Sequence, residues 1–163
     1  MKAAMLPLAL LAVALPAATA APFDPATIAG QYVAHHPNGD ISGASYFTDD
    51  VLEIVPTKPG AAYVRLQSYF YNGHQCSLSG VAHVEGQRLV YRPKVQPGCT
   101  FGIRRNGASI ALEDGDGQCR AYYCGARGGL DDPASFAAKT RKPIRYMTRL
   151  KASSEYRDAL KED

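Results

Sequence analysis

The sequence predicts a mainly β protein: a small antiparallel up-and-down barrel, or a two-sheet sandwich, of seven to eight strands with a short C-terminal helix and two disulfides. Three observations predict it. Apolar and polar residues alternate with period two across residues 30–113. Tight-turn signals such as Glu85-Gly86 and Asn106-Gly107 separate the alternating runs. The chain also holds four cysteines, an even number that favours two disulfides in an oxidising compartment.

The first twenty residues indicate export. Met1-Lys2 gives a positive start, residues 3–16 are almost entirely apolar, and Ala18-Thr19-Ala20 has the small-x-small pattern cut by signal peptidases. Removing residues 1–20 leaves 143 of the 163 residues, enough for one domain with one core. The apolar run is too short to span a bilayer, and no cysteine stands at the cleavage point for a lipid anchor. We therefore expect a monomer of the periplasm or the medium, with no transmembrane segment.

The strand assignment depends on which residues share a face. In the run 63–71, Val64, Leu66 and Phe70 lie on one face, and Tyr63, Arg65, Gln67 and Tyr69 lie on the other. Further strands are expected at residues 31–34, 44–47, 51–55, 75–84, 87–92, 99–105 and 108–113. Residues 133–138 are expected to form one helical turn and residues 140–150 to be extended. Ser153 or Ser154 is expected to cap the final short helix.

One β domain is expected over residues 21–138, with a basic C-terminal segment, residues 139–163, whose helix packs on it. That segment has a net charge of +4, and the chain between the leader and Lys139 has −2. A solvated basic face explains such a charge, and the alternative is an envelope interaction protein whose segment docks on an anionic partner. The weak overall charge and the export signal argue against nucleic-acid binding.

The four cysteines are expected to meet at one end of the meander. Cys76 and Cys99 share faces with apolar residues and therefore point inward, and Cys119 and Cys124 follow strand 108–113 at the same end. Three pairings remain open. The spacing of Cys119 and Cys124 is not the C-x-x-C of thioredoxin-like enzymes, so we expect structural disulfides rather than a redox pair or a metal site.

The sequence carries no recognisable catalytic or cofactor motif. No serine lies in a G-x-S-x-G elbow, no glycine loop matches the phosphate-binding patterns, and no histidine has metal-ligand spacing, so neither cofactor nor metal is expected. The enzyme alternative is a small exported hydrolase that uses His74 beside Cys76, or a carboxylate pair such as Asp49-Asp50 or Asp131-Asp132. A disulfide-bonded Cys76 is no nucleophile, and paired aspartates suit turns.

Tyrosines are the most suggestive candidates for a binding surface. The chain has ten tyrosines and no tryptophan. Tyr69 and Tyr71 lie on the polar face of strand 63–71. Tyr122 lies in the loop between Cys119 and Cys124, and Arg127 follows that loop. Because exposed Tyr and Arg residues are typical of interfaces, we predict a non-catalytic binding role toward another protein or an envelope component. The other interpretation is that the tyrosines lie beneath the C-terminal segment.

Several motifs resemble a group of uncharacterised exported proteins of Gram-negative bacteria: Asn72-Gly73-His74-x-Cys76, Gly80-Val81-Ala82, Leu89-Val90-Tyr91-Arg92, Cys99 and Tyr123-Cys124-Gly125-Ala126-Arg127-Gly128. Their general plan is similar to the small periplasmic lysozyme inhibitors, disulfide-tied β-barrels that insert a Ser-Gly-x-x-Tyr loop into the lysozyme cleft. Residues 42–46 have this pattern, so the resemblance implies Ser42 and Tyr46 as contacts. The chain departs from these inhibitors in two ways. Its motif lies near the mature N-terminus, whereas theirs lies in the second half of the chain. An inhibitor of a basic enzyme is expected to be acidic, whereas the chain between the leader and Lys139 has a net charge of only −2.

Overall fold

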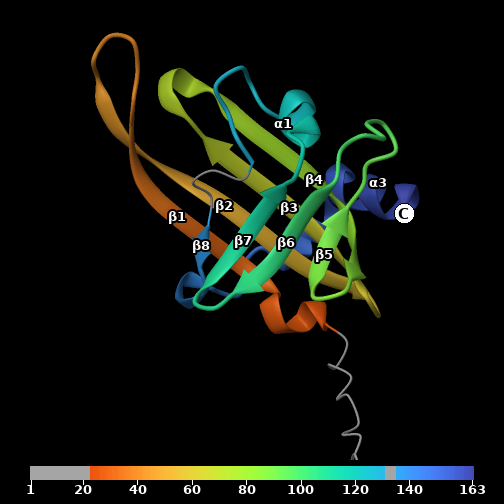
Figure 1. The fold of residues 1–163 in the computed structure, drawn as a ribbon. Coiled ribbons are helices and arrows are strands. Elements are labelled where there is room, and N and C mark those ends of the chain that lie inside the picture. The colour runs from red at the N-terminus through yellow and green to blue at the C-terminus, as the bar shows by residue number, and fades with distance from the viewer. Residues whose placement is uncertain (1–22, 131–134) are drawn as a thin grey trace, which may run out of the picture.

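The computed structural model describes residues 23–130 and 135–163 and has the predicted antiparallel barrel (Figure 1). The predicted leader, residues 1–20, lies outside the described residues. Each strand pairs with the strands next to it in the chain, and all eight belong to a single sheet. Of the two predicted architectures, the structure is therefore the barrel and not the two-sheet sandwich. The strands are β1 (Gly30–Gly39), β2 (Ser45–Lys58), β3 (Ala61–Tyr69), β4 (Gln75–Glu85), β5 (Arg88–Tyr91), β6 (Phe101–Asn106), β7 (Ser109–Asp114) and β8 (Phe136–Ala137).

The barrel is nearly closed by the chain that follows β8. Gln31 in β1 and Lys142 exchange both backbone hydrogen bonds, with N···O distances of 2.8 Å each way. Just before this point, the amide of Ala138 donates to the carbonyl of Ala108 beside β7. The C-terminal segment therefore joins the first strand to the last at this end of the sheet.

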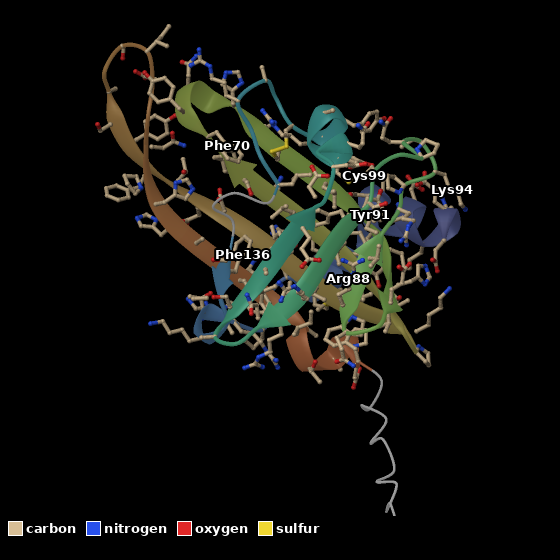
Figure 2. All side chains as sticks on the ribbon, viewed as in Figure 1. Phe70, Arg88, Tyr91, Lys94, Cys99 and Phe136 are labelled. Carbon is tan, nitrogen blue, oxygen red and sulfur yellow. A yellow bond between two sulfur atoms is a disulfide. The ribbon has the colours of Figure 1, made fainter. Side chains whose placement is uncertain are left out.

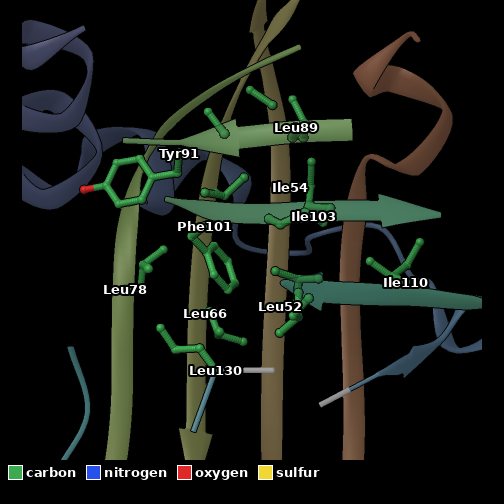
Figure 3. Close-up of a cluster of buried hydrophobic side chains, with 14 of the residues drawn as sticks. Leu52, Ile54, Leu66, Leu78, Leu89, Tyr91, Phe101, Ile103, Ile110 and Leu130 are labelled. Atoms are coloured by element: carbon green, nitrogen blue, oxygen red, sulfur yellow. The ribbon is translucent and has the colours of Figure 1, made fainter. Parts of the chain in front are cut away.

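The interior of the barrel holds the main core, as period-two alternation requires (Figure 3). Val64 and Leu66 point inward, as the sequence predicted. The other fully buried side chains include Leu52, Ile54, Leu78, Leu89, Phe101, Ile103, Ile110, Leu130 and Phe136. Phe70 packs at the rim of this core and Phe136 within it (Figure 2).

Two disulfides close one end of the barrel, and both predicted cysteine properties are confirmed: all four are bonded, and all lie at that end. Cys76 of β4 is bonded to Cys124, and Cys99 is bonded to Cys119 in the helix α1 (Gln118–Tyr123). Figure 2 shows Cys99 near this helix. The first bond spans 48 residues and the second 20, so together they attach α1 and its flanking loops to the sheet.

The short C-terminal helix is confirmed as α3 (Ser154–Glu162). Ser153 is its N-cap, and the side chain accepts the amide of Tyr156 at 3.2 Å. The remaining helical segments are the 3₁₀ turns η1 (Pro25–Ile28), η2 (Tyr71–Gly73) and η3 (Ala138–Thr140), and the helix α2 (Met147–Ala152). Among the described residues, no helix has the length and apolar character needed to cross a membrane.

Several local predictions were wrong, and the first concerns β2. Residues 44–47 and 51–55 do not form two strands, because Asp49 and Asp50 continue the ladder opposite His35 and Ala34 instead of turning the chain. The segment between Cys119 and Cys124, expected as a loop, forms most of α1: the buried Asp114 accepts the amides of Cys119 and Arg120 in its first turn at 3.1 and 2.7 Å.

The third and fourth corrections lie after the disulfides. The described part of 133–138 forms β8 and enters η3 instead of making a helical turn, because residues 136 and 137 pair with β7. Residues 140–150 are not extended throughout, since α2 begins at Met147 and buries Leu150. The hairpin turns are shifted by one residue: Gly86 and Gly107, at φ 61° and 58°, occupy the first turn position, and Asn106 pairs with Ser109.

A second apolar cluster lies on the outside of the barrel, beneath α2 and α3. It consists of Val55, Tyr63, Ile144, Leu150 and Tyr156. Tyr63 points away from the interior, as the alternation predicted, but its side chain is fully buried, with its ring 4.7 Å from that of Tyr156. For this tyrosine, the interpretation that it lies beneath the C-terminal segment is correct.

Candidate binding site

The outer ends of β1 and β2 and the turn between them project beyond the rest of the barrel (Figure 1). We call residues 35–49 the hairpin arm. Asp40 organises its tip: one carboxylate oxygen accepts the Ser42 amide at 2.8 Å, the Ser42 hydroxyl at 2.5 Å and the Ala44 amide at 3.2 Å. The hydroxyl of Ser42, and then these amides, hold the pKa of Asp40 below its ordinary value.

The connection between β3 and β4 supports the arm from one side. Tyr71, predicted on a strand, lies in η2, and its hydroxyl donates to the carbonyl of Asp40 at 2.6 Å. The Tyr46 hydroxyl donates to the Gly39 carbonyl at 3.3 Å. Gly39 has no room for a side chain larger than hydrogen without displacing its neighbours, because an added Cβ would lie 3.1 Å from the Ala44 carbonyl oxygen. The arm is therefore ordered by specific contacts up to its tip.

A hollow of about 740 Å³ lies between the arm and the β3–β4 connection. We call it the mouth groove. It is lined by Ala34, His36, Pro37, Asn38, Gly39, Asp50, Tyr69, Phe70, Tyr71 and Ser135. Aromatic rings thus form one wall, and the upper part of β1 forms the other. Most ligand sites combine an apolar lining with few polar groups in this way.

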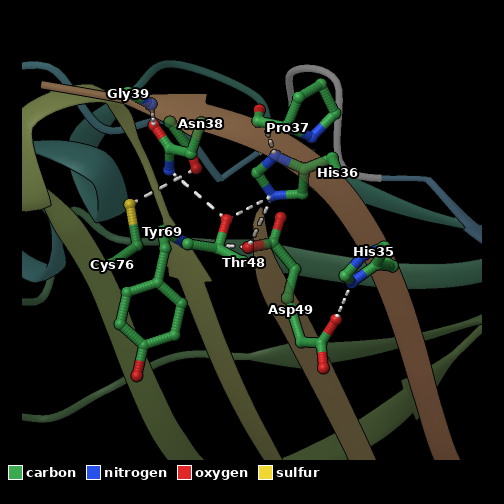
Figure 4. A network of polar contacts seen from close by, with 11 residues as sticks. His35, His36, Pro37, Asn38, Gly39, Thr48, Asp49, Tyr69 and Cys76 are labelled. Atoms are coloured by element: carbon green, nitrogen blue, oxygen red, sulfur yellow. Dashed lines mark hydrogen bonds and ion pairs between the residues drawn. The ribbon is translucent and has the colours of Figure 1, made fainter. Parts of the chain in front are cut away.

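A small polar network lies on β1 and β2, at the side of the groove that these two strands form (Figure 4). Asp50 is only 8% exposed, and one of its oxygens accepts the Tyr69 amide at 2.8 Å and lies 3.2 Å from His36 Nε2. Thr48 Oγ1 also faces that nitrogen, at 3.4 Å, and receives a hydrogen bond from Asn38. The network fixes the positions of the groove's polar side chains and pairs the buried carboxylate.

This network is not arranged for nucleophilic catalysis. In a hydroxyl–imidazole–carboxylate relay, the hydroxyl and the carboxylate face different ring nitrogens. One nitrogen takes the hydroxyl proton, while the carboxylate orients the ring through the other nitrogen. In this protein Thr48 and Asp50 both face Nε2 of His36, and Nδ1 faces the Pro37 carbonyl at 3.3 Å.

Large apolar side chains are exposed on the arm and on the β3–β4 connection. Ile41 is 78% exposed, Phe47 66% and Tyr71 45%, and Tyr46 also belongs to this set. The Phe47 ring is stacked on that of His35, with centroids 4.8 Å apart, so it is held outward on the arm. The β-ladder places Phe47 on the arm directly opposite Pro37.

The arm also has a distinctive charge. Residues 35–49 include two carboxylates, Asp40 and Asp49, and neither lysine nor arginine. Asp49 is exposed and lies 2.6 Å from His35, and Asp40 is partly exposed at the tip. Glu53, further along β2, is buried and paired with Arg65.

The structure brings four of the six predicted binding residues together. Ser42 and Tyr46 are in the arm, and Tyr69 and Tyr71 line the mouth groove. Tyr122 in α1 and Arg127 after it are exposed at the disulfide end, but neither lines the groove.

Sequence reasoning did not assign four residues to a binding site, His36, Asp50, Phe70 and the exposed Phe47, although it considered Asp50 as part of a catalytic carboxylate pair. An unbroken β1–β2 ladder would have revealed His36 and Asp50, because alternation places them on one face. Phe70 was assigned only to the inward face of its strand, and Phe47 only to a short separate strand. Neither assignment indicated how these two rings lie relative to the groove.

The other catalytic candidates do not assemble into a reactive site. Cys76 is bonded to Cys124, and the His74 ring packs against Gly125. Asp49 and Asp50 contact different histidines on opposite faces of β2, and Asp131-Asp132 lies outside the described residues. Within residues 23–130 and 135–163, no cluster of three or more His, Cys, Asp or Glu side chains could hold a metal ion. Comparisons of the chain with protein-family models, with curated proteins and with solved structures found no match.

Proposed function

We propose that this is an exported, non-catalytic binding protein whose partner docks on the hairpin arm and the mouth groove. One observation carries the proposal: an ordered, projecting hairpin exposes Ile41 and Phe47, and the same hairpin lines a groove that Phe70 and Tyr71 also line. Exposed large apolar side chains on a projecting element are typical of surfaces that meet a partner. The two disulfides support export, because they are typical of proteins that fold in an oxidising compartment.

The partner that best fits this surface is a protein with a basic surface next to a cleft. The carboxylates of Asp40 and Asp49 would attract positive charge and speed the encounter. The hydrogen bonds of Asp40 and Tyr71 order the arm before binding, which lowers the entropic cost of docking. Lysozyme is the first candidate, since it is basic and Ser42 and Tyr46 lie at the projecting tip, the position that the resemblance to lysozyme inhibitors requires.

The test is to titrate the purified protein into a lysozyme turnover assay. We expect inhibition near stoichiometry, weakened at least about tenfold by the double variant Ile41→Ser/Phe47→Ser. Val95→Ser is the matched control, because Val95 is equally exposed but lies in the loop between β5 and β6. Absence of inhibition at stoichiometric excess would rule out lysozyme as the partner.

A second measurement tests the binding surface without assuming the partner. Immobilised wild type, the arm variant and the Val95→Ser control are each exposed to an envelope extract, and retained proteins are quantified by mass spectrometry. The surface proposal predicts a protein retained by wild type and control but lost from the arm variant. Identical retention by all three proteins contradicts it.

A further inference from the structure

A second groove, of about 540 Å³, lies at the end of the barrel opposite the hairpin arm, between the β6–β7 turn and η3 (Figure 1). We call it the basal groove. Three of its nine lining residues are cationic, and none is acidic: Tyr32, Arg105, Ala108, Ser109, Ile110, Ala137, Ala138, Lys139 and Arg141. The cations come from separate parts of the chain: Arg105 from β6, Lys139 from η3 and Arg141 from the segment that closes the barrel.

The charges of these three side chains are not neutralised within the described part of the chain. None of Arg105, Lys139 and Arg141 forms an ion pair with residues 23–130 or 135–163, although nearby Arg104 and Arg88 are both paired with Glu113. All three side chains are exposed to solvent. Like charges gathered in one hollow repel one another, and an anion in that hollow would relieve the repulsion.

Tyr32, Arg105 and Arg141 line this groove together. The Tyr32 hydroxyl donates to the Ile28 carbonyl at 2.9 Å. Burial raises the pKa of this hydroxyl, and the positive charges of Arg141 and Arg105 oppose that rise.

The arginine positions are held by the fold. Arg141 donates one hydrogen bond to the Thr27 carbonyl at 2.7 Å, and its aliphatic carbons lie over Gly30, 3.2 Å from the point where a Cβ would be. Arg105 donates from Nε to the Gly107 carbonyl at 3.3 Å. Each guanidinium has five N–H donors, so both retain free donors on the forked end that binds phosphate bidentately.

We propose that the basal groove binds a phosphate group through Arg105, Lys139 and Arg141. The ligand is a phosphate ester or diphosphate, carried either by a small molecule or by a lipid headgroup of the envelope. This site is independent of the proposed partner surface, because it lies at the other end of the barrel and shares no residue with the mouth groove.

The experiment uses two probes: sodium pyrophosphate, followed by calorimetry, and vesicles of equal parts phosphatidylglycerol and phosphatidylcholine, followed by co-sedimentation against pure phosphatidylcholine. The groove variant is Arg105→Gln/Lys139→Gln. The control, Lys151→Gln/Arg157→Gln, removes the same charge from exposed residues of α2 and α3. We expect the groove variant to lose at least about tenfold in affinity and the control to stay within about twofold.

The two probes separate the two sources. Pyrophosphate binding without vesicle binding identifies a small-molecule phosphate, and binding to the anionic vesicles alone identifies a lipid headgroup. Binding of neither probe, or equal losses in the groove variant and the control, overturns the proposal. If the double variant fails to fold, Lys139→Gln replaces it, because the exposed Lys139 side chain makes no ion pair within the described residues.

Discussion

Replacing Arg65 by methionine should leave a buried carboxylate without its cation. Glu53 is fully buried between the barrel and the C-terminal segment. One of its oxygens accepts Nε and Nη2 of Arg65 at 2.8 and 2.6 Å, and the other accepts Gln31 Nε2 at 3.1 Å and the hydroxyl of Tyr146. Burial alone would lower the pKa of Arg65, but the Glu53 charge and hydrogen bonds raise it above its ordinary value.

The expected cost follows from this burial. Removing one partner of a buried ion pair typically costs about 3–5 kcal/mol, because the remaining charge is desolvated without compensation. The Arg65 side chain is 21% exposed, so solvent screens the pair little. For a domain with about 5–15 kcal/mol of stability, Arg65→Met should thus remove a large share of the free energy of unfolding. The double variant Glu53→Leu/Arg65→Met leaves no unpaired charge and should recover most of the loss.

The measurement is urea unfolding of the oxidised protein, followed by far-UV circular dichroism. Arg157→Met serves as the control, since Arg157 is an exposed arginine of α3. A cost below about 1 kcal/mol for Arg65→Met would refute the reasoning, because exposed pairs contribute amounts of that size. So would a double variant that is no more stable than Arg65→Met, because the penalty would then come from lost packing, not from the stranded charge.

Two further predictions concern the disulfides and the arm. From the 48- and 20-residue separations, chain entropy gives a cost of about 4 kcal/mol for replacing the Cys76–Cys124 pair by serines and about 3 kcal/mol for the Cys99–Cys119 pair. Urea unfolding tests this, and a reversed order contradicts it. Because the pKa of folded Asp40 lies below the ordinary 3.8, its contribution is complete above that value and is lost as pH falls through the lowered pKa. The amide NMR signals of Ser42 and Ala44 should therefore stay constant down to about pH 4, and a midpoint at or above 3.8 argues against the Asp40 bonds.

Much of the barrel could be predicted because its determinants are local. Alternation with period two places Val64 and Leu66 inside, and four inward or end-facing cysteines in a chain with a predicted export signal predict two disulfides. The cap of α3 at Ser153 is likewise visible within a few residues. The strand prediction failed where a local pattern fits two structures. The pair Asp49-Asp50 is typical of a turn, but in the structure it continues a strand, and its carboxylates face His35 and His36 across an unbroken ladder.

The sequence by itself determined most of the strands, the face that most of their residues occupy and the number of disulfides, because these depend on neighbours within a few positions. Only the tertiary structure decided what covers each face. Tyr63 and Tyr69 share one face of β3, yet α3 buries the first, whereas the second borders the mouth groove and is only partly buried. The cysteine pairing, the Glu53–Arg65 cluster and the meeting of Arg105 with Arg141 were decided there too. Each depends on the distance between residues far apart in the chain, which period and composition do not encode.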